Sequence, residues 1–432
     1  MTTQIFCAST LYGAATLAAA LDAGCFAPAY RRILLVTNNA STPEITPAVD
    51  EMPGFEQLRH HFDDVLSWNG TIAPFHPGGW SPRPDDVPLW ERHLRLLWNL
   101  GTDDIELAVE SLQVNPALAI AQIFTGVPVD VYADGLMSYG PTRSKIDPLV
   151  GTRVRRLLHL DLVPGLKPLL LTEFGVGPEV VPTEQFLKVL TQLACTAPEL
   201  PNSPTALLLG QYLSALSILT PEEEEQLHVR MLRGAAGRGH HRIMFKPHPS
   251  APARYSRALE EEAVKLGVEL TVLDLPVLAE VLYERLRPAL VVGCFSTALF
   301  TAREFYGLEV ARTGTDLLLE RLTPYENSNR IPVTLTDALL PDLEAGPTTT
   351  APDLEALLKT VGFMMQPQLH PLLRPTAERH LTAHPSTRYV KRRRLMALAL
   401  PGGLPAQLAF LPRNATTRRM VRQVRSLRRA LQ

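Results

Sequence analysis

The residues best suited to chemistry in this 432-residue chain are a lysine and a histidine set between prolines at 246–249 (Lys-Pro-His-Pro). The apolar residues 243–245 before them are typical of the end of a buried strand. Because proline continues neither a helix nor a strand ladder, Lys246 and His248 are predicted to lie on a fixed, irregular turn. Such a turn suits an anionic leaving group. A plain surface turn that ends a strand is the structural alternative.

A candidate general base follows another apolar run. Residues 128–132 are predicted to form a strand, and Asp134 comes just after it, beside Gly135, which allows a substrate to approach closely. A carboxylate at the carboxyl end of a buried strand can accept a proton from a hydroxyl group. A turn-forming Asp-Gly pair is the structural alternative. Tyr139 lies in the Ser-Tyr-Gly-Pro-Thr sequence that follows, and we expect it on the acceptor side.

A third candidate is a pair of hydroxyl side chains at a predicted helix start. Residues 289–292 are predicted to form a strand that leads through Gly293 to Ser296 and Thr297, before a helix at 298–306. Hydroxyls and free backbone N–H groups at a helix N-terminus can bind a phosphate. Ordinary helix capping uses the same geometry and is the alternative.

Two further turns lie where strands are predicted to end. The turn 9–13 separates a strand at 4–8 from an alanine-rich helix at 14–23. A structural turn is the preferred interpretation, with acceptor contact by Ser9 and Thr10 as the functional alternative. Gly210 and Gln211 follow the strand predicted at 206–209, in the same half of the chain as the Lys-Pro-His-Pro turn.

The alternation of strands and helices predicts an α/β protein with parallel sheets. The length fits two domains, and the best linker is 196–204, with three prolines in nine residues. We therefore expect domains at 1–195 and 205–375 and a basic tail at 385–432. Residues 69–88, rich in proline and glycine, are predicted to form a long irregular loop.

The composition indicates a soluble globular protein, with 46% apolar and 20% charged residues. Four scattered cysteines argue against a zinc site and a disulfide framework. A reducing, cytoplasmic setting is therefore expected. The N-terminus lacks the basic region of a signal peptide, and no apolar run reaches the ~18 residues of a membrane span.

The net charge of −2 conceals an asymmetry. From residue 388 to the end there are 12 basic and no acidic residues, which leaves 30 basic against 44 acidic before it. Arginines and apolar residues partly segregate on a helix predicted from about residue 416. This pattern is typical of a helix on the inner face of a membrane, or of a solvated basic helix on the acidic body. Nucleic-acid binding is disfavoured, because aromatic stacking residues are absent from this tail.

Taken in order, Asp134-Gly135, the stretch 246–249 and Ser296-Thr297 resemble the motifs of the bacterial alpha-2,8-polysialyltransferase family, over about residues 3–375. The resemblance implies a GT-B fold with two Rossmann-like domains facing across a cleft, 1–195 for the acceptor and 205–375 for the nucleotide sugar, and a CMP-activated sugar as donor. It implies that Asp134 deprotonates the acceptor.

The same resemblance implies that the leaving phosphate is bound by a group of donor-side residues. These are His248, Ser296 and Thr297, with Gly210 and Gln211 near the nucleotide, and Lys246 and Pro249 beside them. The sequence departs from the family at Ala133, where the family has a first acidic residue. The role of a second carboxylate is therefore in question.

The predicted function is an inverting, metal-independent transfer of sialic acid, or a related ulosonic acid, to a glycan or glycolipid hydroxyl. The donor carries its own leaving group, so no cofactor is expected. Two alternatives stay open: a CDP-glycerol-type polymer transferase, and a non-catalytic nucleotide-binding or membrane-associated scaffold.

Overall fold

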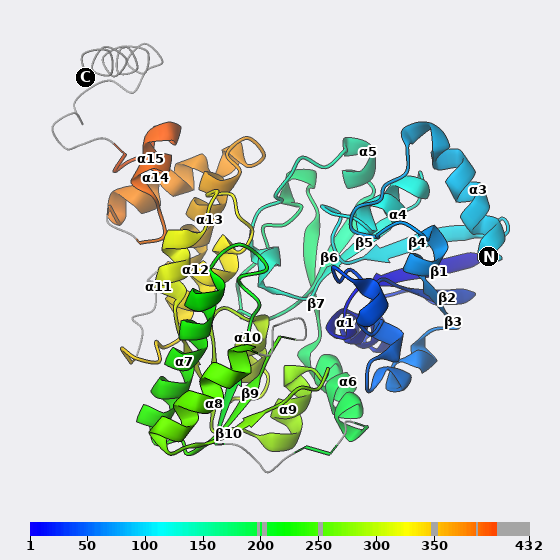
Figure 1. Cartoon of the computed structure of the whole chain (residues 1–432). Coiled ribbons are helices and arrows are strands. Elements are labelled where there is room, and N and C mark those ends of the chain that lie inside the picture. The colour runs from blue at the N-terminus through cyan, green and yellow to red at the C-terminus, as the bar shows by residue number, and fades with distance from the viewer. Residues whose placement is uncertain (197–198, 201–204, 249–253, 347–352, 386–387, 404–432) are drawn as a thin grey trace. The chain divides into compact units, whose positions relative to one another are not determined.

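A computed structural model describes residues 1–196, 199–200, 205–248, 254–346, 353–385 and 388–403. The chain forms two compact units, Met1–Pro352 and Asp353–Gln432. Both sheets belong to the first unit (Figure 1). The second unit contributes the helices α13 (Leu354–Met365), α14 (Arg374–Ala383) and α15 (Arg392–Leu398).

The first sheet contains seven strands in the order β3-β2-β1-β4-β5-β6-β7, all paired in parallel. Their bounds are β1 Thr2–Ala8, β2 Arg31–Val36, β3 Asp64–Ser67, β4 Asp104–Val109, β5 Val129–Ala133, β6 Val154–Leu160 and β7 Gly177–Val181. The helices are α1 Leu11–Asp22, α2 Trp68–Ile72, α3 Val87–Leu97, α4 Ala117–Ile123, α5 Pro148–Gly151 and α6 Thr183–Cys195.

The two faces of this sheet differ because side chains alternate along each strand. Odd-numbered residues of the central strands, such as Ile5, Leu107 and Val131, belong to an apolar core with residues of α2, α3 and α4. Even-numbered residues point to the other face. On that face Gln4 donates to Glu106 and the Tyr132 hydroxyl bonds to Glu110. Polar groups of neighbouring strands therefore meet on one face of the sheet.

The second sheet has five parallel strands in the order β10-β9-β8-β11-β12. They are β8 Ala206–Leu209, β9 Arg242–Lys246, β10 Glu269–Val272, β11 Leu290–Gly293 and β12 Glu309–Arg312. The associated helices are α7 Pro221–Gly237, α8 Arg254–Leu266, α9 Ala279–Leu286, α10 Thr297–Glu304, α11 Thr315–Arg321 and α12 Arg330–Leu339.

Both strand orders follow the doubly wound Rossmann pattern, which confirms the predicted fold class of two Rossmann-like α/β sheets. In each sheet the chain direction across the sheet reverses beside the first strand, between β1 and β4 and between β8 and β11. The carboxyl ends of strands beside such a reversal are where α/β proteins bind ligands. The candidate residues follow β1, β5, β8, β9 and β11, so they lie at these ends.

Three local predictions were wrong in part. Residues 69–88 are not wholly irregular, because α2 occupies their start and α3 begins at Val87. The Ser67 hydroxyl caps α2 and Trp68 is fully buried, so tertiary packing holds this short helix in place. The turn after β1 is shorter than expected, since α1 begins at Leu11. Lys246 belongs to strand β9, paired with Leu209, rather than to the turn.

The predicted tail helix from about residue 416 lies outside the described residues. Within the described part of the chain, none of the helices combines the length and apolar character needed to cross a bilayer.

The segment after β5 packs against α12 at a point where only glycine fits. A Cβ atom on Gly140 would lie 2.8 Å from Cγ1 of Ile331. Three residues further along, Nη1 of Arg143 donates to the Ser328 hydroxyl at 3.3 Å. The loop that carries Asp134 is therefore held between β5 and α12.

We expect Gly140→Ala to lower the free energy of unfolding by about 1–3 kcal/mol, because the added methyl group overpacks this contact. In a double-mutant cycle with Ile331→Ala, the double variant should be more stable than the sum of the two single changes predicts, by more than about 0.5 kcal/mol. Gly177→Ala is the matched control, since its Cβ would meet nothing within 4 Å. Urea unfolding of the four variants measures these values, and strict additivity would contradict the contact.

Candidate active site

The Lys-Pro-His-Pro turn is placed by a close approach between β8 and β9. The Gly210 N–H donates to the Lys246 carbonyl oxygen at 2.9 Å. A Cβ atom on Gly210 would lie 2.9 Å from Cζ of Phe245 and 3.2 Å from Cα of Pro247. Glycine at 210 therefore lets the chain after β9 pack directly against the end of β8. Pro249 lies outside the described residues.

Lys246 and His248 lie close enough to influence each other. Partial burial lowers the pKa of His248 and the Lys246 charge lowers it further, while Glu224 opposes both. Burial also lowers the pKa of Lys246, against the attraction of Glu280 and Asp274. Both shifts favour the neutral forms. A bound anion would reverse this preference, so these groups are suited to charging when a phosphate arrives.

Ser296 is the N-cap of α10, and its hydroxyl oxygen accepts from the Ala298 N–H at 3.3 Å. The capping prediction is thus confirmed, and phosphate binding by Ser296 stays a prediction. Gln211, which follows β8, accepts from the Phe295 N–H at 2.9 Å through Oε1. The turn before α10 is therefore fixed from the neighbouring strand end.

The loop after β5 reaches the same helix end. The Leu136 N–H points to the Thr297 hydroxyl oxygen at 3.5 Å. A Cβ atom on Gly135 would lie 3.2 Å from that oxygen, so the approach needs a residue with little bulk. The structure thereby brings Asp134-Gly135 and Ser296-Thr297 together, although they lie about 160 residues apart.

Asp134 is half-buried at the end of β5. Burial raises the pKa of its carboxyl group, while hydrogen bonds from its own backbone and from the Thr10 hydroxyl oppose the rise. Thr10 also caps α1, since its hydroxyl oxygen accepts from the Gly13 N–H at 2.9 Å. A Cβ atom on Gly13 would lie 3.0 Å from the Tyr132 hydroxyl oxygen and 3.5 Å from Oδ2 of Asp134. Glycine at 13 therefore lets these oxygen atoms come close to the start of α1 beside the candidate base.

The residue that sequence reasoning missed here is Glu110, the first residue after β4. The Ser9 hydroxyl donates to its carboxylate, and the Tyr132 hydroxyl lies 3.3 Å from Oε2. Burial, and after it the charge of Asp134, raises the pKa of Glu110 to about 7. Its position at a strand end beside the β1/β4 reversal is the signal that could have identified it.

Tyr139 lies deeper than the other predicted acceptor-side residues. Its side chain is 1% exposed, and its hydroxyl oxygen accepts from the Val163 N–H at 3.1 Å. Burial raises its pKa to about 12. Its contact with an acceptor stays a prediction, and the visible role of the hydroxyl is to hold the chain after β6.

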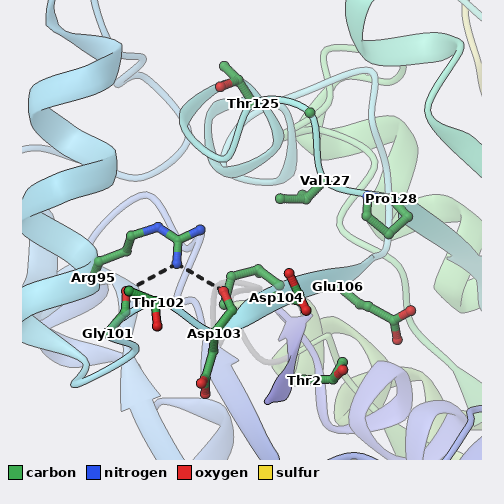
Figure 2. Close-up of a pocket in the computed structure, with 12 residues that line it drawn as sticks. Thr2, Arg95, Gly101, Thr102, Asp103, Asp104, Glu106, Thr125, Val127 and Pro128 are labelled. Atoms are coloured by element: carbon green, nitrogen blue, oxygen red, sulfur yellow. Dashed lines mark hydrogen bonds between the residues drawn. The ribbon is translucent and has the colours of Figure 1, made fainter.

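A separate surface pocket lies at the other end of the first sheet, where the strands begin. Figure 2 shows it at the amino ends of β1, β4 and β5, where the Arg95 guanidinium binds the carbonyl oxygens of Gly101 and Asp103. Its volume is about 620 Å³. The side chains of Asp103, Asp104 and Glu106 line it, so its charge does not suit a phosphate. In the described ranges, no group of three or more His, Cys, Asp and Glu side chains is arranged to hold a metal ion.

Several solved structures are similar to this chain. UDP-GlcNAc 2-epimerase from Methanocaldococcus jannaschii has 14% identity and a TM-score of 0.45, over 84% of this chain and 91% of its own. The GT-B domain of a sialyltransferase from Photobacterium damselae has 13% identity and a TM-score of 0.39, over 77% and 95%. MurG from Acinetobacter baumannii has 12% identity and a TM-score of 0.40, over 88% and 95%.

A search of curated protein sequences found no match. Residues 4–314, in contrast, match the family described as alpha-2,8-polysialyltransferase (POLYST). This range includes both sheets, together with Asp134, His248 and Ser296. The match confirms the predicted family and, with it, the predicted enzyme class. The chain therefore belongs to the alpha-2,8-polysialyltransferase family and is a glycosyltransferase.

Proposed function

We propose that this glycosyltransferase moves sialic acid, or a related ulosonic acid, from a CMP-activated donor to a glycan or glycolipid hydroxyl, with inversion and without a metal ion. One observation carries the proposal. The loop of the candidate base meets the N-terminus of α10 through Leu136 and Thr297. An acceptor beside Asp134 and a donor phosphate at α10 would then be neighbours.

Asp134 is proposed to accept the proton of the acceptor hydroxyl. Its Oδ2 lies beside Gly13, and the Thr10 hydroxyl hydrogen-bonds to its carboxylate. Burial raises its pKa, which makes it a stronger base once ionised. The acceptor oxygen then bonds to the anomeric carbon as the bond from that carbon to the phosphate oxygen breaks. Attack opposite to the leaving group inverts the centre.

The leaving phosphate is proposed to lie at the N-terminus of α10. The free N–H groups of the first helical turn and the hydroxyls of Ser296 and Thr297 donate to anions. His248 and Lys246, at the end of β9, which is separated from β11 by β8, would add positive charge as the phosphate departs. This supply of charge is the reason for proposing a reaction without a metal ion.

We propose further that the protein works in the cytoplasm at the inner face of the membrane, through its basic tail. The described start of this tail carries Lys391 and the arginines 392–394. Such clusters bind anionic lipids at about 1 kcal/mol per charge. We expect the full chain to float with vesicles containing phosphatidylserine, and a chain ending at residue 384, which lacks this cluster and the rest of the tail, to float less. Equal flotation of the two chains would contradict a contribution from the basic tail.

The donor and the two catalytic assignments are tested together by measuring CMP release from CMP-sialic acid. We expect Asp134→Asn to lower kcat by about 10²- to 10⁴-fold, since the base is lost, and His248→Ala to lower it by about 10²-fold, since charge at the phosphate is lost. Asp85→Asn and His241→Ala are controls, because both residues are exposed and His241 lies at the amino end of β9, opposite to His248. Added EDTA should leave the rate unchanged. If the enzyme turned over CDP-glycerol and not CMP-sialic acid, the proposed donor would be wrong and CDP-glycerol would take its place.

The phosphate site at α10 is separable from helix capping. Aspartate caps a helix as well as serine does, but its charge repels a phosphate. We expect Ser296→Asp to keep the unfolding midpoint and to abolish CMP binding measured by calorimetry. Ser296→Ala should cost about 1 kcal/mol of stability through the lost cap, and Ser296→Asn is the uncharged capping control. If the aspartate variant bound CMP with wild-type affinity, the phosphate would bind at a site other than Ser296.

A further inference from the structure

The acidic residue missing at position 133 has a counterpart on the neighbouring strand. Ala133 packs against the apolar core, on the face of the sheet that contains Val131. Since side chains alternate along a strand, Asp134 points to the opposite face. A carboxylate at position 133 would therefore point away from Asp134. Glu110, which ends β4, points to the same face as Asp134.

Three contacts tie Glu110 to the acceptor side. The Ser9 hydroxyl donates to its carboxylate, and the Ser9 N–H lies 3.4 Å from Oε2. The Tyr132 hydroxyl lies 3.3 Å from the same oxygen and donates to the Cys7 carbonyl oxygen at 2.8 Å. The Tyr132 hydroxyl oxygen and Oδ2 of Asp134 both lie beside Gly13. The two carboxyl groups thus flank one small polar region.

We propose that Glu110 is the positioning partner of Asp134, holding a proton in the resting enzyme so that Asp134 carries the single negative charge and acts as the base. This inference rests on the proposed function. In the transfer step the acceptor proton goes to Asp134, the new carbon–oxygen bond forms, and the electron pair of the broken bond leaves on the CMP phosphate. Glu110 keeps its proton throughout, so it adds no second negative charge to the site.

The surroundings of Glu110 support this assignment. The groups that act on it are Asp134, whose charge raises its pKa, and Ser9 and Tyr132, whose hydrogen bonds partly oppose the rise. Among these groups of the described structure there is no Lys or Arg. Without a cation nearby, two ionised carboxylates would repel each other and the anionic donor. One proton shared by the pair removes that repulsion.

Unfolding as a function of pH tests the protonation of Glu110 without any substrate. A carboxyl whose pKa is higher in the folded state than in the unfolded state stabilises the protein at low pH. This contribution is lost as the pH rises through the folded value of about 7. We expect the wild type to lose stability relative to Glu110→Gln between pH 5 and pH 8. Glu106→Gln, on the same strand, should run parallel to the wild type above pH 5.5. Parallel curves for wild type and Glu110→Gln would overturn the proposal.

Turnover of CMP-sialic acid tests the catalytic part. We compare kcat/KM at pH 8.5 with kcat/KM at pH 6.5 in each protein. This ratio should be at least threefold higher in Glu110→Gln than in the wild type, because glutamine stays neutral at the pH where Glu110 ionises. His248 titrates in both proteins, so its contribution cancels in the comparison. An unchanged ratio in an active variant overturns the role of Glu110 alone. A wild type without any turnover contradicts the proposed function instead, so the two failures are distinguishable.

Discussion

The candidate site depends on a contact between backbone and hydroxyl, where the loop after β5 meets the N-terminus of α10. The Leu136 N–H faces the Thr297 hydroxyl oxygen, and Gly135 leaves no side chain between them. A Cβ atom at position 135 would lie 3.2 Å from the Thr297 hydroxyl oxygen, so a larger residue would push the loop and the helix apart. Every proposed chemical role assumes this approach, because a base and a phosphate site act on one substrate only if they are neighbours.

Charge is divided between the two sheets in a way that suits transfer to a neutral hydroxyl. The first sheet contributes buried carboxyl groups whose pKa values are raised by burial, Glu110 and Asp134. The second contributes Lys246 and His248, whose pKa values are lowered by burial. Without substrate, the raised pKa values reduce the negative charge of the first set and the lowered pKa values reduce the positive charge of the second. A bound phosphate would favour the protonated forms of Lys246 and His248. When the phosphate leaves, this preference would be lost.

The sequence was sufficient to predict the five strands that lead to the candidate residues, because these buried strands are apolar runs that end in glycine, proline or small residues. It indicated no strand at β3 or β12. It was sufficient to place Asp134, Gly210 and Ser296 at strand ends. It did not predict α2, where Trp68 is held by tertiary burial in a segment rich in helix breakers. Nor did it predict Glu110, because a single glutamate after a strand becomes notable only when Ser9 and Asp134 are known to lie beside it. Such partners come from other strands, so local pattern cannot identify them.

Strand β4 shows how strongly such partners decide the chemistry of a carboxyl group. Glu106 and Glu110 lie four residues apart and point to the same face of the sheet. Although partial burial alone would raise the pKa of Glu106, hydrogen bonds from Gln4 and Arg155 lower it. At Glu110 burial is deeper, the neighbouring charge is Asp134, and the pKa rises. Arg155 and Arg156 lie at the amino end of this face, where they also bind Asp130. The amino end of this face is thus held by ion pairs. At its carboxyl end the pKa values of Glu110 and Asp134 are raised, which suits one group that holds a proton and one that accepts a proton.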